Sequence, residues 1–201
     1  MQGRKKSVNK QDVIAFFDER AAEWDRTLRH DDEVISAILD NAEVGRGCDV
    51  LDVGCGTGVL IPDYLSRQVG SVTAVDISPE MLRVAAAKFP HENVRFLCAD
   101  AECAEFDREF DCIVIYNAFP HFEDPDGLIR SLSRFLKPGG TLSVAHGMSR
   151  AAIDAHHSGA AEKVSRGLMH EDELAAIFEK YLKVTVKISD ERMYQVAGRR
   201  M

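Results

Sequence analysis

The chain has 201 residues and a mass of 22.3 kDa, which is the size of one ordinary domain. Hydrophobic residues make up 45% of it and charged residues 29%, so it can bury a full core and lies outside the composition of disordered or fibrous proteins. With 25 Lys and Arg against 33 Asp and Glu, the net charge of −8 repels phosphate backbones and anionic lipid. We therefore expect neither nucleic acid nor a membrane as a partner.

The five cysteines are odd in number and contain no C-x-x-C pair, which disfavours a disulfide framework or a zinc ribbon. No apolar run approaches the roughly 18 residues of a membrane span. The N-terminus is basic and then amphipathic, where a secretory signal would be continuously apolar. These features predict a location in a reducing cytoplasm.

Two kinds of segment alternate along most of the chain. Residues 1–45 carry Phe16, Phe17, Ala21 and Trp24 at helical spacing and precede the first strand signal. From there on we expect strands at 50–53, 72–76, 94–99, 111–116 and 141–145, helices at 59–68, 79–89 and 126–136, and a turn at 137–140. Strands that alternate with helices build right-handed crossovers and hence a parallel sheet.

The C-terminal part breaks this alternation. A helix at 171–182 is followed by strand-like runs at 184–189 and 193–197, separated only by residues 190–192. That connection is too short for a parallel crossover, so the two runs should pair antiparallel. The sequence therefore predicts an α/β fold: a doubly wound, mostly parallel seven-stranded sheet with a C-terminal antiparallel hairpin.

A glycine-rich loop follows the first expected strand. It reads Asp52-Val53-Gly54-Cys55-Gly56-Thr57-Gly58 and leads directly into a helix. Glycine has no Cβ, so such a loop lets the backbone approach a ligand, and the helix N-terminus behind it favours negative groups. Dinucleotide-binding folds use G-x-G-x-x-G in the same context, but Val59 stands where that motif has its third Gly or Ala.

Further segments of the chain match one family in order. Residues 74–78, 98–101 and 110–117 resemble the ends of its second, third and fourth strands, and 136–142 its approach to the fifth. With the motif E/D-x-G-x-G-x-G at 52–58, the chain resembles the class I S-adenosylmethionine (SAM) dependent methyltransferases. The resemblance implies a Rossmann-like domain that transfers a methyl group from SAM to a small-molecule acceptor by in-line displacement, releases S-adenosylhomocysteine (SAH) and needs no metal.

The same resemblance divides the single domain 1–201 into four parts. These are a helical lid at 1–45, a SAM-binding core at 46–146, a substrate-side insertion at 147–170, and a helix with the terminal hairpin at 171–201. In the lid, residues 17–25 are similar to a segment that folds over SAM in small-molecule methyltransferases. Phe17 and Trp24 are its expected lid contacts.

Three acids are expected to recognise the cofactor. Asp76 closes the second strand, where a carboxylate can accept two hydrogen bonds from the ribose diol, although NAD enzymes place an acid similarly. Asp100 would accept from the adenine amino group, and Asp52 would order the glycine loop or receive the methionine ammonium. The expected cofactor set comprises Asp52, Gly54, Cys55, Gly56, Gly58, Asp76, Ile77, Met81, Asp100, Ala101 and Asn117.

Histidines are the candidate bases, because imidazole takes up a proton near neutral pH. His146, at the end of the fifth strand, is our first choice, followed by His121 and then by His157, which Asp154 could orient. Phe119 and His156 are expected at the substrate side. Four of the seven histidines lie in 145–170, which raises the question of a metal, but adjacent His156 and His157 would point about 100° apart on a helix. We predict no metal site.

Two other functions remain open from the sequence. One is a SAM-binding regulator or subunit without catalysis. The other is an NAD-dependent oxidoreductase, which the Gly58-Val59 spacing and the terminal hairpin oppose.

Overall fold

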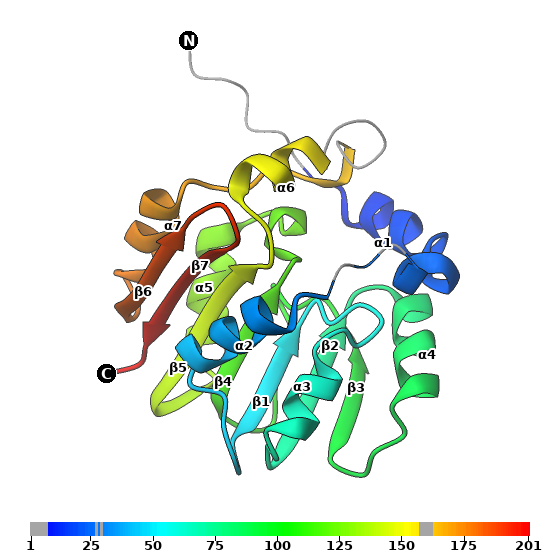
Figure 1. The fold of residues 1–201 in the computed structure, drawn as a ribbon, viewed down its shortest axis with the longest axis horizontal. Coiled ribbons are helices and arrows are strands. Elements are labelled where there is room, and N and C mark those ends of the chain that lie inside the picture. The colour runs from blue at the N-terminus through cyan, green and yellow to red at the C-terminus, as the bar shows by residue number, and fades with distance from the viewer. Residues whose placement is uncertain (1–7, 27, 29, 157–162) are drawn as a thin grey trace.

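The computed structural model describes residues 8–26, 28, 30–156 and 163–201 and contains one seven-stranded sheet (Figure 1). Its strand order is β3-β2-β1-β4-β5-β7-β6. The strands are β1 (Asp49–Val53), β2 (Ser71–Asp76), β3 (Val94–Cys98), β4 (Phe110–Tyr116), β5 (Leu136–His146), β6 (Lys183–Ser189) and β7 (Tyr194–Arg199). β1 to β5 pair in parallel, whereas β7 pairs antiparallel with both β5 and β6. The predicted fold class, including the terminal hairpin, is confirmed.

Helices cover both faces of the sheet. They are α1 (Lys10–Asp18), η1 (Ala21–Arg26), α2 (Asp32–Asn41), α3 (Ile61–Ser66), α4 (Pro79–Lys88), η2 (Phe119–His121), α5 (Pro125–Ser133), α6 (Arg150–His156) and α7 (Glu171–Phe178). One core packs α5 and α7 against the sheet, and a second core packs α2 and α3 against the opposite face. Within the described ranges, no helix is long and apolar enough to cross a membrane.

Strand β4 shows why the central strands are apolar throughout. Ile113 and Ile115 join the core beneath α5 and α7, whereas Cys112, Val114 and Tyr116 join the one beneath α2 and α3. Successive side chains of a strand point to opposite faces, and both faces are covered here. A continuous apolar run is therefore required, as the sequence shows.

The expected turn at 137–140 is wrong, because these residues belong to β5. Helix α5 ends at Ser133 and the strand begins at Leu136. The pairing shifts along β4 from Phe110↔Leu136 to Cys112↔Thr141, so the extra residues form an irregularity inside the strand. A Cβ on Gly140 would lie 2.9 Å from the Asp111 carbonyl oxygen, so the close approach of the two backbones requires glycine there.

The other boundaries differ at element ends. The helix expected at 59–68 covers only Ile61–Ser66, and the one expected at 171–182 ends at Phe178. The remaining residues form the turns that lead into and out of each helix, which the apolar periodicity does not distinguish from helix.

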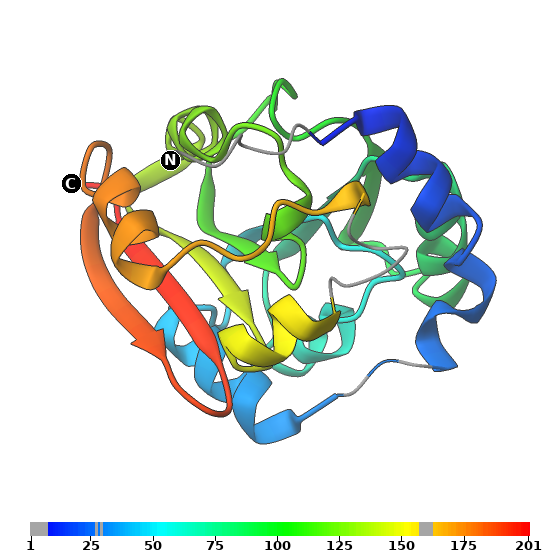
Figure 2. The same ribbon diagram turned by 90° about the horizontal axis from the view of Figure 1, so that it is seen from above.

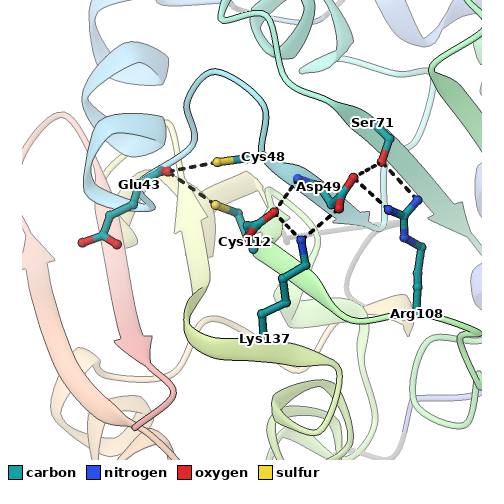
Figure 3. Close-up of polar contacts among 8 residues, drawn as sticks. Glu43, Cys48, Asp49, Ser71, Arg108, Cys112 and Lys137 are labelled. Carbon is teal, nitrogen blue, oxygen red and sulfur yellow. Dashed lines mark hydrogen bonds and ion pairs between the residues drawn. The ribbon is translucent and has the colours of Figure 1, made fainter.

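A polar network ties the amino ends of β1, β2 and β4 together (Figure 3). Asp49 accepts from the Ser71 hydroxyl at 2.6 Å and pairs with Lys137 at 2.9 Å and Arg108 at 2.8 Å. Burial alone would raise the pKa of Asp49, but the Ser71 hydrogen bond and the two cations bring it below its ordinary value. Beside it, the Cys48 and Cys112 thiols both approach the carbonyl oxygen of Glu43, at 3.8 Å and 3.5 Å. The network lies at the edge opposite the glycine loop and fixes strand register there.

Helix α1, from the segment before β1, and helix α6, from the segment after β5, lie over the carboxyl ends of the parallel strands. Figure 1 and Figure 2 show α1 on one side of this edge and α6 on the other. Helix α1 and η1 pack against α4. In open α/β sheets ligands bind at this edge, so both segments are placed to cover a site.

Candidate active site

A cleft of about 990 Å³, including the open space at its mouth, lies at the carboxyl ends of β1 to β4 beneath α1 and η1. Thirteen of the residues singled out in the sequence line it: Phe17, Trp24, Asp52, Gly54, Cys55, Gly56, Asp76, Ile77, Met81, Asp100, Ala101, Asn117 and His121. The structure thus brings most of the predicted cofactor set together.

The three glycines of the loop have positive φ angles but different surroundings. A Cβ on Gly54 would lie 2.6 Å from the Ala118 Cβ, so this glycine allows the loop to meet the segment after β4. A Cβ on Gly58 would lie 3.0 Å from the Phe89 ring, and Gly58 does not line the cleft. Gly56 has no atom within 4 Å of such a Cβ and lines the cleft. It is therefore the glycine whose backbone a ligand can approach.

Asp76 joins the glycine loop to the end of β2. Its carboxylate accepts from the Gly56 amide at 2.8 Å and from the Ser78 amide at 2.9 Å. Burial raises the pKa of Asp76, although these two amides favour the ionised form. A carboxylate offers about four acceptor positions, so the remaining positions of Asp76 can accept from a ribose diol.

Asp52 is a buried acid in the wall of the cleft, and its side chain is 2% exposed. Burial raises the pKa of Asp52 to about 7, and the negative charge of Asp76 adds to the effect. A positively charged ligand group would stabilise the ionised form. Asp52 thus fits the ammonium of a methionine moiety.

Asp100 also lines the cleft and is bound to helix α1. One carboxylate oxygen accepts from the Glu102 amide at 3.0 Å, and the other accepts from the ammonium of Lys10 in α1. Lys10 and Glu102 both line the cleft, and sequence reasoning missed them. No local pattern reveals a contact between residues 90 positions apart.

The third region of the cleft is aromatic. The Phe17 ring lies 5.3 Å from the Trp24 ring and 5.0 Å from the His121 ring, centre to centre. Tyr116 and Phe122 also line this region and were not predicted, although both flank the segment 117–121 that was singled out. Its walls can exclude water and hold an apolar or planar molecule.

His121 is the candidate base that the structure places in the cleft. Its Nδ1 atom lies 2.7 Å from the Val164 carbonyl oxygen. A carbonyl can only accept, so Nδ1 carries the hydrogen and Nε2 carries the lone pair in the neutral ring. This tautomer suits a general base acting through Nε2.

The other candidates lie elsewhere. His146 is 2% exposed, packs against Tyr194 in β7 at 6.1 Å between ring centres, and is not part of the cleft lining. Along β5 it shares a face with Val144, which belongs to the core beneath α5 and α7. Phe119 is likewise buried in that core and not in the cleft lining. His156 ends α6, but its side chain, like all of His157, lies outside the described residues.

Asn117 adopts a left-handed backbone conformation, with φ of 53°, directly after β4. Its side-chain oxygen accepts from the Gly147 amide at 3.1 Å. This bond joins the segments that follow β4 and β5 at the edge of the cleft. Among the residues the structure describes, no three His, Cys, Asp or Glu side chains are grouped to hold a metal ion.

Comparison with known proteins agrees with this geometry. A family described as a methyltransferase domain matches residues 50–140. The chain is 32% identical to the malonyl-[acyl-carrier protein] O-methyltransferase of Acetivibrio thermocellus over 139 residues, which are 68% of this chain and 49% of that protein. It is 37% identical to the ubiquinone biosynthesis O-methyltransferase of Xanthomonas oryzae over 114 residues, or 55% of this chain and 46% of that one. The chain thus spans about half the length of these relatives.

A solved structure extends the likeness to almost the whole chain. The DhpI–SAH complex superposes with a TM-score of 0.76 at 21% identity, covering 95% of this chain and 96% of that one. The family match over residues 50–140 and the two relatives indicate a class I SAM-dependent methyltransferase. SAM is the cofactor of this family, and the acids and glycines of the cleft fit its ribose, adenine and methionine groups.

Proposed function

We propose that this methyltransferase transfers the methyl group of SAM to a small-molecule acceptor, with His121 as the general base. The proposal is supported by the side chains that line a single cleft. The cofactor cradle formed by Gly56 and Asp76 opens into the same cavity as an aromatic wall and an oriented histidine. The O-methyltransferase names of the relatives favour an oxygen acceptor.

The acids predicted from the sequence would each bind a different part of SAM. Asp76 holds the ribose, Asp100 the adenine amino group, and Asp52 the ammonium. Bound SAM supplies an electrophilic methyl group, so the protein has mainly to align the acceptor and exclude water, which can contribute roughly 7–11 kcal/mol. The rings of Phe17 and Trp24 exclude water at the acceptor side.

His121 would take the acceptor's proton at Nε2. The Val164 carbonyl then stabilises the imidazolium through the Nδ1 hydrogen. General-base assistance of this kind typically accelerates a reaction by about 10²–10⁴-fold.

Two measurements test the proposal. Calorimetry should show SAH binding, and SAH formation from SAM should appear with some member of a panel of hydroxylated metabolites. His121→Ala should then lower kcat by at least tenfold and leave SAH affinity nearly unchanged, because the base acts on the acceptor. His91→Ala, at an exposed position outside the cleft lining, is the matched control.

The outcomes separate the competing functions. SAH binding without turnover on any acceptor would favour a non-catalytic regulator. Full activity of His121→Ala across pH 6–9 would remove His121 as the base, and the same test on His146→Ala and His157→Ala would then decide between the remaining histidines.

A further inference from the structure

Lys10 connects the first turn of α1 to the far end of the cleft. Asn9 caps this helix by accepting from the Gln11 amide at 2.8 Å, which fixes where Lys10 begins it. The Lys10 ammonium lies 2.8 Å from a Glu102 carboxylate oxygen and also binds Asp100. Burial alone would lower the pKa of Lys10, but its two carboxylate partners raise it above the ordinary value. The ammonium therefore stays charged at neutral pH.

Two other lid residues bind the loops of the cofactor cradle. Asp18 accepts from the Ser78 hydroxyl at 2.6 Å, and the Ser78 amide holds Asp76. Asp25 accepts from the Thr57 hydroxyl at 2.5 Å, between two glycines of the loop, and from Lys88 at 2.6 Å. These contacts reach neighbours of the cofactor-binding groups. Lys10 differs because it pairs with a carboxylate that is itself expected to bind the cofactor.

The positive charge of Lys10 offsets the repulsion between the Asp100 and Glu102 carboxylates. The carboxylates of Asp100 and Glu102 both lie within reach of one ammonium, and their side chains are only 20% and 11% exposed. In the part of the chain that the structure describes, no second cation pairs with either acid. Without Lys10 the two negative charges would repel each other, which would favour a turn of the Asp100 side chain away from Glu102. Such a turn would remove the acceptor from the place where an amino group could reach it.

We infer that Lys10 is a positioning residue for the adenine of SAM. It holds the Asp100 carboxylate oriented toward the exocyclic amino group, and it couples adenine recognition to the position of α1 over the cleft. The inference rests on the cofactor site of the proposed function and is independent of the acceptor and of His121.

The test compares two ligands whose purines differ at C6 and N1. SAH carries the C6 amino group, whereas S-inosylhomocysteine carries a C6 carbonyl oxygen, which only accepts, and has its single donor on that edge at N1. Wild-type protein should bind SAH more tightly. In Lys10→Met, SAH affinity should fall by about fivefold, the scale of one partly exposed charge-assisted contact, while S-inosylhomocysteine affinity changes much less. The preference for SAH therefore shrinks, and Lys10→Arg should restore much of it.

Lys88→Met is the matched control, because it breaks a lid contact at Asp25 and leaves the adenine end intact. It should affect both ligands equally. Thermal melts of the unliganded variants establish that each is folded. Equal weakening of both ligands by Lys10→Met, or no weakening, would overturn the inference, as would a wild type that does not discriminate. A wild type that binds neither ligand would instead refute the proposed cofactor function.

Discussion

The buried acid Asp52 should make the free protein less stable as the pH rises. Its pKa is about 7 in the folded chain and 3.8 in the unfolded one, so between these values only the unfolded form releases the proton. The contribution of Asp52 to stability is thus greatest below about pH 4 and falls until the pH passes about 7. At 1.36 kcal/mol per pKa unit, the loss reaches at most about 4 kcal/mol.

Asp52→Asn removes this titration while preserving shape. Without SAH, its free energy of unfolding should exceed that of wild type at pH 8, and the gap should be about 2–3 kcal/mol larger at pH 8 than at pH 5. Guanidinium unfolding at both pH values measures the gap. Asp49→Asn is the control of opposite sign, because the pKa of Asp49 is lowered and its removal should destabilise at pH 8. A gap for Asp52→Asn that does not change with pH would refute the reasoning. The same variant should bind SAH more weakly, since the ammonium loses its carboxylate.

Three further outcomes are expected. Asp76→Ala should lower SAH affinity at least tenfold by calorimetry, because two hydrogen bonds of about 1.5–3 kcal/mol each are lost; an unchanged Kd would remove Asp76 from the site. Gly56→Val should abolish SAH binding, since its side chain would enter open cleft space; the φ of 53° strains a β-branched residue, so the melting temperature should fall while the melt stays cooperative, and normal binding would show that the loop is not the cradle. Iodoacetamide at pH 8 should label exposed Cys98 quickly and Cys112 hardly at all, because burial raises the pKa of Cys112 to about 12, and peptide mapping that finds equal labelling would contradict the burial.

The features that were predictable from sequence are those encoded locally. The glycine loop and Asp76 lie on a strand-loop-helix unit and the strand beside it, and parallel strands bring their carboxyl ends to one edge. Their mutual hydrogen bond follows almost directly from that topology. The short connection at 190–192 likewise fixed the antiparallel hairpin.

The features that were missed depend on contacts between distant segments. Lys10 meets Asp100 across 90 residues, and His121 meets Val164 across 43. No periodicity in either segment encodes the partner. The environment of His146 was also not predictable from nearby residues. It is the last residue of β5, as expected, but its side chain lies against Tyr194 because β5 pairs with β7.

The negative charges that line the cleft should affect both the binding of SAM and the release of SAH. Asp52, Asp76, Asp100 and Glu102 line it, and Lys10 is the one Lys or Arg that the described lining contains. SAM carries a sulfonium, an ammonium and a carboxylate, for a net charge of about +1, whereas SAH has lost the sulfonium charge. An acidic cleft therefore attracts the substrate form of the cofactor more strongly than the product form. In the proposed reaction, methyl transfer would itself remove part of the attraction that holds the cofactor, which would favour release of SAH and entry of a new SAM.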